Sequence, residues 1–369
     1  MKIAHVLWSL NVGGLEQGLC WLLRYQVKQG LEPTVVCCRD EQGALRRQVD
    51  ALGIPVRSAR MRSGRDLFGS RRLKGILRDL GPDIVHSRVE DPASHAAIVS
   101  GLRRTTRLLH QDGGGEALHP GWSIRKTIMY RWLASRWHAA IASSPAMFQF
   151  LTRRAGFPHV RLILQSIPAT DYVLPAREQR SRMRRERDID ENAFVVVGCG
   201  RLHEVKDWPL FIQTVAACKR KILFLIVGDG PERENLELMA HTSRAPVRFV
   251  GMQRPVAPWL ALADVFLLTS ICEGFGRAMV EAMASGLPIA AAPYQGMEND
   301  IFRHNREGLF ANHRDPKELA ELIETLSEDD VRRKTLGQNA RSRAVTQFDM
   351  RREADQVLQL YQEICHACY

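Results

Sequence analysis

The stretch Glu273-Gly-Phe-Gly-Arg-Ala-Met-Val-Glu-Ala-Met-Ala-Ser-Gly286 lies between two clear local signals. The short apolar run Val265–Leu268 before it is typical of a buried strand. The Ala, Met and Glu residues within it favour a helix, and Gly286, followed by Pro288, supplies a C-terminal stop. The stretch therefore predicts a strand, a glycine-rich loop and a helix that begins near Gly276 or Arg277.

This arrangement places Glu273 in the loop and Glu281 about 7–8 Å along the helix axis from its start. The two carboxylates are then too far apart to share a proton, and are placed to hold two parts of one extended ligand. Gly274 and Gly276 let the backbone approach closely, and the free amides at the helix start favour an anion. Two hydroxyl acceptors beside a phosphate site describe a sugar nucleotide. The alternative is a solvent-exposed Glu281 beside an ordinary turn.

The spacing of these residues closely resembles the signature of the retaining, nucleotide-sugar-dependent family-four glycosyltransferases. It has two Glu separated by seven residues, Gly-Phe-Gly after the first and Ala-Met-Ala-x-Gly around the second. The resemblance implies that Glu273 contacts hydroxyls of the donor sugar, Glu281 contacts the nucleotide ribose, and the loop with Gly274, Phe275 and Gly276 contacts the diphosphate. It also implies the GT-B fold, an α/β arrangement of two Rossmann-like doubly wound domains facing each other across a cleft.

The composition is that of a globular protein with more than one core. A chain of 369 residues with 45% hydrophobic and 25% charged residues is expected to form two domains. No apolar run approaches the length of about 18 residues that spans a bilayer. The N-terminal segment shows no cleavage-site pattern, and most of the eight cysteines lie in apolar stretches, so we expect a cytoplasmic protein with reduced thiols. The clustered Cys365 and Cys368 lack a second ligand pair, so we expect no zinc site there.

Strand-like runs alternate with helix-type segments along the chain, which predicts parallel sheets covered by helices. We expect residues 1–168 to form an acceptor-side domain, residues 169–349 to form the nucleotide-sugar domain, and residues 350–369 to form a helix that packs back on the first domain. The junction is expected near Gln165–Pro175, with the charged segment Arg177–Arg187 after it. The predicted strands are Ile3–Trp8, Thr34–Cys38, Ile54–Val56, Ile84–His86, Leu108–His110, Ala139–Ala142, Arg161–Leu164, Phe194–Gly198, Ile222–Val227, Val247–Val250, Val265–Leu268 and Ile289–Ala291.

Two cations follow the first strand of the second domain. The run Val195–Gly200 suggests a dinucleotide fingerprint, but His203 stands where the third glycine is needed, which argues against a nicotinamide cofactor. Arg201 and Lys206, just before a predicted helix, resemble the family's phosphate clamp. Two fixed cations would stabilise the negative charge that develops on a departing nucleoside diphosphate. The alternative is a pair of solvated surface cations.

Three weaker candidates come from other loops. Gly13 and Gly14 follow the first strand, where the family carries a Gly-Gly loop facing the donor, although a tight turn would also explain them. His110 ends a strand and opens a glycine-rich loop, so it could hydrogen-bond the transferred sugar or the acceptor, or be structural. The loop containing Met252 lies where the family's backbone meets the nucleotide base.

Divalent metal is not expected to be required. The chain has one Asp-x-Asp sequence, Asp188–Asp190, which follows a run of arginines and reads as a solvated turn. We therefore expect no metal and no cofactor, with a UDP- or GDP-sugar as co-substrate.

The net charge of +11 implies an anionic partner, which could be a nucleotide diphosphate, an acidic membrane surface or nucleic acid. The basic, aromatic stretch Trp122–Trp137 looks like a membrane-surface helix, but its cations scatter around the helix wheel. Peripheral association with the inner face of the cell membrane is therefore a hypothesis.

These features predict a metal-independent, retaining glycosyltransferase that moves a sugar from a UDP- or GDP-sugar to a polysaccharide, exopolysaccharide, lipopolysaccharide or lipid-linked oligosaccharide acceptor. The alternatives are a sugar-nucleotide epimerase of similar architecture and a basic nucleic-acid-binding protein. The latter would leave the Glu273–Glu281 cluster unexplained, so we expect no nucleic acid partner. Two loops depart from the family pattern. The segment Leu164–Pro168 lacks the usual Asn-Gly, and the loop after Tyr294 has one glycine where two are common.

Overall fold

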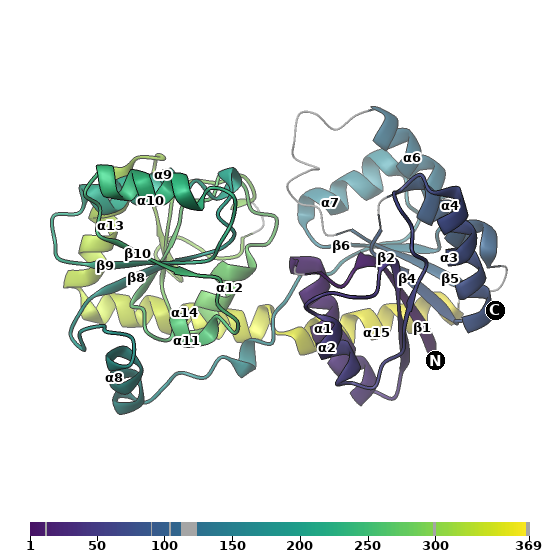
Figure 1. Cartoon of the computed structure of the whole chain (residues 1–369), viewed down its shortest axis with the longest axis horizontal. Helices are drawn as coiled ribbons and strands as arrows, with labels where there is room; N and C mark the ends of the chain where they lie inside the picture. Colours follow the sequence, from purple (N-terminus) through teal and green to yellow (C-terminus); the bar gives the residue numbers. More distant parts are fainter. Residues whose placement is uncertain (12, 90, 103–104, 112–123, 298–299, 367–369) are drawn as a thin grey trace. The chain divides into compact units, whose positions relative to one another are not determined.

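The chain divides into two compact units in the computed structural model, which describes residues 1–11, 13–89, 91–102, 105–111, 124–297 and 300–366 (Figure 1). Unit 1 consists of Met1–Ser166 together with Met350–Tyr369, and unit 2 consists of Ile167–Asp349. The chain thus passes from unit 1 to unit 2 at residue 166, where the sequence placed the boundary at 168. The C-terminal helix, α15 (Met350–His366), belongs to unit 1.

Unit 1 is built on a parallel sheet of seven strands in the order β3-β2-β1-β4-β5-β6-β7. These strands are β1 (Lys2–Ser9), β2 (Glu32–Asp40), β3 (Val56–Ser58), β4 (Ile84–Ser87), β5 (Thr106–Gln111), β6 (Ala139–Ala142) and β7 (Val160–Leu162). The central residues of β1, β2 and β6 are mostly apolar and buried, as is typical of strands that are covered on both faces. All seven strands predicted for this half are confirmed, with β3 starting two residues later than expected.

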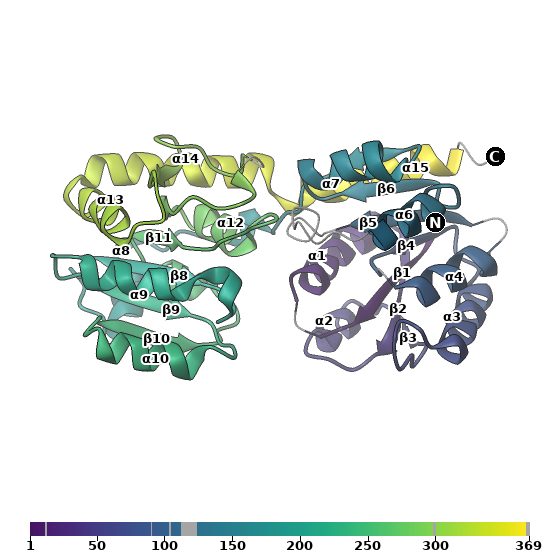
Figure 2. The ribbon, with the colours of Figure 1, turned by 90° about the horizontal axis from the view of Figure 1, so that it is seen from above.

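Helices cover both faces of the unit 1 sheet, and Figure 2 shows α1 and α2 on one face and α3 and α4 on the other. The helices are α1 (Gly14–Lys28), α2 (Arg46–Asp50), α3 (Leu67–Leu80), α4 (Pro92–Gly101), α6 (Ile124–Ala134), α7 (Pro145–Gln149) and the π-helix η1 (Phe150–Ala155). Helix α15 packs along α1, where Gln26 donates a hydrogen bond of 3.2 Å to the hydroxyl of Tyr361. The last helix of the chain is therefore part of the N-terminal core.

Unit 2 repeats this plan with six parallel strands in the order β10-β9-β8-β11-β12-β13. The strands are β8 (Val195–Cys199), β9 (Leu223–Val227), β10 (Val247–Gly251), β11 (Val265–Leu268), β12 (Ile289–Ala291) and β13 (Gly308–Phe310). The sequence predicted the first five and missed β13. This strand has three residues, and Gly308 lies so close to β12 that an added Cβ would meet the carbonyl oxygen of Ile289.

In unit 2, α9 and α10 cover one face of the sheet, and α11, α12 and α14 cover the other (Figure 1). The helical segments are η2 (Ala169–Asp171), α8 (Arg177–Arg185), η3 (Glu204–Lys206), α9 (Trp208–Ala217), α10 (Arg233–Thr242), α11 (Ala257–Leu260), α12 (Arg277–Ala284), α13 (Pro316–Glu328) and α14 (Asp330–Gln347). Two parallel sheets, each with helices on both faces, confirm the predicted class of two doubly wound α/β domains. Within the described ranges, no helix is long and apolar enough to cross a membrane.

The charged segment after the predicted junction is not a linker. Residues 177–185 form helix α8 of unit 2, and its Arg184 is 2% exposed. The Arg184 guanidinium donates to the carbonyl oxygens of Leu262, Glu191 and Ala193 and to the carboxylate of Asp264 at 2.9 Å. Backbone carbonyls and one carboxylate thus satisfy a buried guanidinium in a segment that the sequence identified only as charged and close to the junction.

Asp264 is the residue that this arrangement depends on. Its carboxylate pairs with Arg184 and, at 2.8 Å, with Arg180, and accepts the backbone N–H of Val195 at the start of β8. Replacing Asp264 by Ala would leave Arg184 buried without its counter-ion, so we expect unfolding free energy to fall by about 3–5 kcal/mol. Urea unfolding would measure this. Asp330→Ala, which removes the ion pairs of a half-exposed carboxylate with Arg333 and Lys334 in the same unit, is the control and should leave the midpoint nearly unchanged. Equal effects would contradict this role of Asp264.

Candidate functional site

The strand order of each sheet fixes where a ligand can bind. In unit 2 the order reverses between β8 and β11, and in unit 1 between β1 and β4. At such a reversal the chains that leave two neighbouring strands turn in opposite directions, which opens a crevice beyond their carboxyl ends. In unit 2, β8 leads into the segment with Arg201 and Lys206, and β11 leads into the loop with Glu273. The sheet therefore brings two predicted groups of site residues to the same edge.

Lys206 and Glu273 are in direct contact. The Lys206 Nζ lies 2.6 Å from Glu273 Oε1, and the same oxygen accepts a hydrogen bond of 2.7 Å from the hydroxyl of Ser270. Glu273 is 9% exposed, and the Lys206 side chain is partly buried. Because the ion pair is largely buried and the Ser270 hydroxyl also bonds to its carboxylate, the position of both charged groups is well defined. The structure thus brings together Lys206, which was predicted to bind the phosphates, and Glu273, which was predicted to bind the donor sugar.

The loop between β11 and α12 leads into a helix that has no side-chain cap at its start. Gly276 is the N-cap residue of α12 with φ of 75°, in the left-handed region that favours glycine, and no side chain caps the helix. The first amides of α12 are therefore available to an anion. Phe275 contributes only its backbone to such a site, because its ring is buried and packs edge-to-face against Phe348, with centroids 5.5 Å apart.

Glu281 lies inside α12, as predicted, and its carboxylate accepts a hydrogen bond of 2.9 Å from the hydroxyl of Tyr172. Burial raises the pKa of Glu281, while the bond from Tyr172 and the charges of Arg277 and Arg254 act in the opposite direction. Its environment is therefore not that of a solvent-exposed helix residue. Sequence reasoning missed Tyr172, because it comes from a loop more than a hundred positions away.

Two other predicted residues of unit 2 lie on the surface. Arg201 follows β8, is exposed, and makes no side-chain hydrogen bond or ion pair with another described residue. Met252 follows β10 and is also exposed. A second missed residue supports the loop from behind. Arg314 donates to the carbonyl oxygens of Thr269, Ser270 and Pro293 and pairs with Asp207, which caps α9. No sequence signal distinguishes this arginine from the other basic residues of the chain.

Burial argues against the Cys199 thiol as a nucleophile near this cluster. Cys199, the last residue of β8, has its thiol pKa raised to about 12, mainly by burial and also by the nearby Glu281. A thiol with this pKa is protonated at neutral pH and is a poor nucleophile.

The predicted residues of unit 1 occupy the carboxyl ends of its strands. Gly13 is the N-cap of α1, Gly14 is its first residue, and neither position has a side-chain cap. His110 lies near the end of β5, is buried, and accepts or donates a hydrogen bond with His86 at 3.0 Å between ring nitrogens. The glycine-rich loop predicted after it lies outside the described residues.

The remaining predicted residues lie on turns and helices. Asp188 and Asp190 lie on the turn after α8, where Asp190 accepts the amide of Asn192. In the described part of the chain no group of three His, Cys, Asp or Glu could hold a metal ion. Of the stretch 122–137, α6 buries Tyr130 and Leu133 and exposes Ile128 and Trp132. Trp122, Cys368 and the side chains of Arg125 and Lys126 lie outside the described residues.

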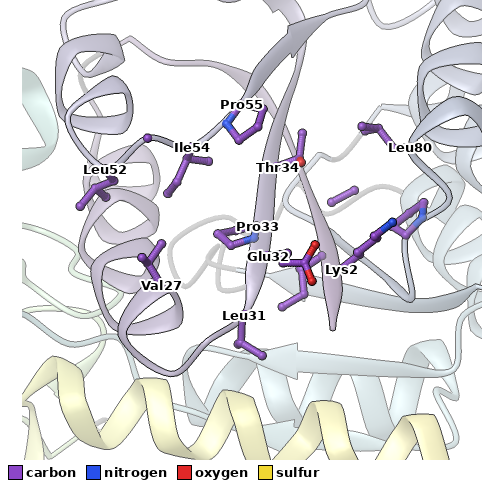
Figure 3. A pocket seen from close by; sticks show the side chains of 14 residues that line it. Lys2, Val27, Leu31, Glu32, Pro33, Thr34, Leu52, Ile54, Pro55 and Leu80 are labelled. Carbon is purple, nitrogen blue, oxygen red and sulfur yellow. The ribbon is translucent and has the colours of Figure 1, made fainter.

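A surface hollow in unit 1 lies at the wrong edge of the sheet to be this site. It is lined by residues at the amino ends of β1 and β2, among them Lys2, Glu32 and Thr34, and by apolar side chains such as Ile54 and Leu80 (Figure 3). Because ligands of parallel sheets bind beyond the carboxyl ends of the strands, we assign it no part in the candidate site.

Comparison with known structures identifies the class of fold. A crystal structure of Anabaena Alr3699/HepE in complex with UDP and glucose superimposes with a TM-score of 0.84, at 22% identity, over 98% of this chain and 100% of that chain. The two domains therefore form the GT-B fold, as the sequence resemblance implied.

Two family descriptions match the chain in succession. Residues 12–168 match "Glycosyltransferase Family 4", and residues 179–343 match "Glycosyl transferases group 1". The chain belongs to the group 1, family 4 glycosyltransferases.

Two curated relatives illustrate the range of this similarity. The lipopolysaccharide core biosynthesis glycosyltransferase LpsE of Rhizobium meliloti is 33% identical over 175 residues, which cover 47% of this chain and 51% of that protein. The chain thus spans about half the length of this relative. A Campylobacter jejuni enzyme, named as an undecaprenol-linked glycan alpha-1,4-N-acetyl-D-galactosaminyltransferase, is 23% identical over 383 residues, covering 100% of both chains.

The buried carboxyl of Glu281 generates a prediction about stability and pH. A pKa raised above the unfolded value of about 4.3 means that the folded protein binds this proton more tightly than the unfolded chain does. Its contribution to stability is then complete below the unfolded pKa and is lost as pH rises through the folded pKa. In Glu281→Gln this loss is absent, so the variant should gain stability relative to the parent between about pH 4 and about pH 8.

Urea unfolding at the two pH values measures this difference. Glu234→Gln removes a carboxylate from an exposed position on α10 and should show no comparable gain. A Glu281→Gln protein whose difference from the parent is the same at both pH values would contradict a raised pKa.

Proposed function

We propose that this protein is a glycosyltransferase that uses a nucleotide sugar as donor and retains the configuration of the transferred sugar. The observation that carries the proposal is the Lys206–Glu273 pair beside the uncapped start of α12. It lies in the part of the chain that matches the group 1 glycosyltransferases. Retention is what the family resemblance implies for the reaction.

Each member of the cluster has a chemical task in this proposal. The first amides of α12 and the Lys206 ammonium hold the diphosphate, and the exposed Arg201 adds a second cation. Charge accumulates on the diphosphate as the glycosidic bond breaks, so these groups stabilise the transition state more than the ground state. Glu273 binds hydroxyls of the donor sugar, and Glu281, oriented by Tyr172, binds the ribose hydroxyls.

The Lys206–Glu273 contact also holds both charged groups of the site in place. A cation and a carboxylate in contact neutralise each other, so neither is buried as an isolated charge. When the donor binds, the diphosphate provides a second anion for Lys206 while Glu273 accepts sugar hydroxyls. We propose that these cations do the work that a divalent metal does in other transferases.

The names of the relatives suggest the class of acceptor. LpsE is named for lipopolysaccharide core biosynthesis, and the Campylobacter jejuni enzyme for an undecaprenol-linked glycan. We propose a glycan acceptor of this kind, carried on a lipid and presented on the cytoplasmic side of the membrane.

The test is a transfer assay with a panel of UDP- and GDP-sugars and a lipid-linked glycan acceptor. A bound donor at 100-fold its dissociation constant should stabilise the protein by about 2.7 kcal/mol in a thermal-shift experiment. Lys206→Ala should lower kcat by roughly 100-fold or more, because it removes a cation that acts on the leaving group. Lys221→Ala, at an exposed position of the same unit, is the control and should retain full activity.

Three outcomes of this assay would contradict the proposal. Equal activity of the Lys206→Ala and parent proteins would remove Lys206 from the site. Loss of transfer in excess chelator would show that a metal is required. Conversion of the donor in the absence of acceptor would indicate a sugar-nucleotide epimerase.

Contact with a membrane surface is proposed through α3 of unit 1. Leu67 and Phe68, in the first turn of α3, are 73% and 72% exposed. Exposed arginines surround them in the sequence: Arg60, Arg62, Arg65 and Arg71. Apolar side chains that enter the lipid boundary, with cations that meet anionic headgroups, are the features of an interfacial helix.

Sedimentation with vesicles tests this surface. The protein should bind vesicles that contain anionic lipid at low salt and dissociate as salt increases, because the attraction to headgroups is screened. The double variant Leu67→Ser, Phe68→Ser should bind at least about 10-fold more weakly, since two apolar side chains no longer enter the lipid. Val331→Ser, at an exposed apolar position of α14, is the control. Unchanged binding by the double variant would rule out α3 as the contact.

A further inference from the structure

Six polar side chains form a continuous hydrogen-bonded chain in the core of unit 1. They come from β1, from α1, from the C-terminal helix α15, and from the carboxyl ends of β4 and β5. All six are buried, and none of the links involves a carboxylate. In order along the chain of hydrogen bonds, they are Arg88, His5, Gln26, Tyr361, His86 and His110.

The direction of every hydrogen bond in this chain follows from its first member. A guanidinium can only donate, so the Arg88 Nη1 donates to His5 Nδ1 at 3.0 Å. Burial, together with the charge of Arg88, lowers the pKa of His5 well below its usual value, so the ring is neutral and carries one proton. That proton must be on Nε2, which donates to Gln26 Oε1 at 2.8 Å.

The side-chain amide of Gln26 links His5 to the C-terminal helix and fixes the direction of the next hydrogen bond. Its Nε2 donates to the Tyr361 hydroxyl oxygen at 3.2 Å. Burial raises the pKa of Tyr361, so the phenol keeps its proton. Among the described residues its hydrogen-bond partners are Gln26 and His86, and an amide nitrogen cannot accept. The Tyr361 hydroxyl therefore donates to His86 Nδ1 at 2.5 Å.

His86 is the last residue before His110 in this chain of hydrogen bonds. Burial and the charge of Arg88 also lower the pKa of His86 well below its usual value, so this ring too is neutral. Since its Nδ1 accepts from Tyr361, its proton is on Nε2, which donates to His110 Nδ1 at 3.0 Å. His110 is thus left with an accepting Nδ1 and carries its proton on Nε2.

We propose that Tyr361 and His86 are positioning residues that hold His110 as a neutral imidazole with its proton on Nε2, so that His110 acts in sugar transfer as a hydrogen-bond donor and not as a general base. The statement about transfer rests on the proposed function. The statement about the tautomer rests on the hydrogen-bond chain alone. The proposal gives α15, the last helix of the chain, a role in the reaction through Tyr361.

The chemical consequence follows from the two ring nitrogens. If Nε2 of His110 were to take a proton from a substrate, it would first have to lose the one that it already carries. If His110 Nδ1 were to take the proton, the hydrogen bond from His86 would break, since His86 Nε2 and His110 Nδ1 would then both be donors. His110 is therefore suited to donate Nε2–H to an oxygen atom of a bound ligand.

Nitrogen-15 NMR of the histidine rings tests the assignment directly on the whole protein. In the parent, His5, His86 and His110 should each show an unprotonated Nδ1 and a protonated Nε2. In Tyr361→Phe the donor to His86 Nδ1 is missing, so we expect His86 and His110 to show a mixture of tautomers. Transfer should fall roughly 3- to 10-fold in kcat/KM for the donor, the effect of one neutral hydrogen bond. Tyr130→Phe, also buried in unit 1 but outside the hydrogen-bond chain, is the control.

The outcomes separate this proposal from the proposed function. A parent protein in which His110 carries its proton on Nδ1 would overturn the proposal, whatever its activity. A Tyr361→Phe protein with an unchanged His110 signature would also overturn it, because Tyr361 would then only pack α15. The expected tautomer in a protein that binds no sugar nucleotide would support the hydrogen-bond assignment and contradict the glycosyltransferase proposal. If Tyr361→Phe does not fold, the parent spectrum still decides the tautomer.

Discussion

Parallel strands all end at the same edge of their sheet, and this constraint positions the candidate site. In unit 2 the neighbours β8 and β11 are separated in sequence by β9 and β10, yet their carboxyl ends lie side by side. The segment after β8 supplies Lys206, and the loop after β11 supplies Glu273 and the start of α12. The 2.6 Å contact between Lys206 and Glu273 is a consequence of this topology. Without the reversal of strand order, the two charged groups would not meet.

Support for the site comes from residues that never need to touch a ligand. Arg314 binds the carbonyls that precede the Glu273 loop, Ser270 holds the carboxylate, and Tyr172 orients Glu281. In unit 1, a chain of donors and acceptors fixes a single proton on His110. In both units, these buried polar groups bond to partners from distant parts of the sequence, which fixes the geometry of the groups that they hold.

The sequence predicted much of the fold because its signals are local. Apolar runs such as Val265–Leu268 identify buried strands, and Gly276 and Gly286 mark the two ends of α12. The site was predicted where its residues form a short motif, as from Glu273 to Glu281. It was not predicted where partners come from far away. Tyr172, Arg314 and Tyr361 have no motif around them, and the burial of Arg184 was not predicted because it depends on carbonyls outside its own helix. The ligand roles of the site residues remain predictions.

The central claim is that a nucleoside diphosphate binds along the start of α12 against Lys206. A crystal structure of the protein with a nucleoside diphosphate or an unreacted nucleotide sugar tests this most directly. The claim requires phosphate oxygens within hydrogen-bond distance of the first α12 amides and of the Lys206 ammonium, with the ribose hydroxyls at Glu281. A diphosphate bound elsewhere, with the Lys206–Glu273 contact and the α12 amides untouched, would contradict it.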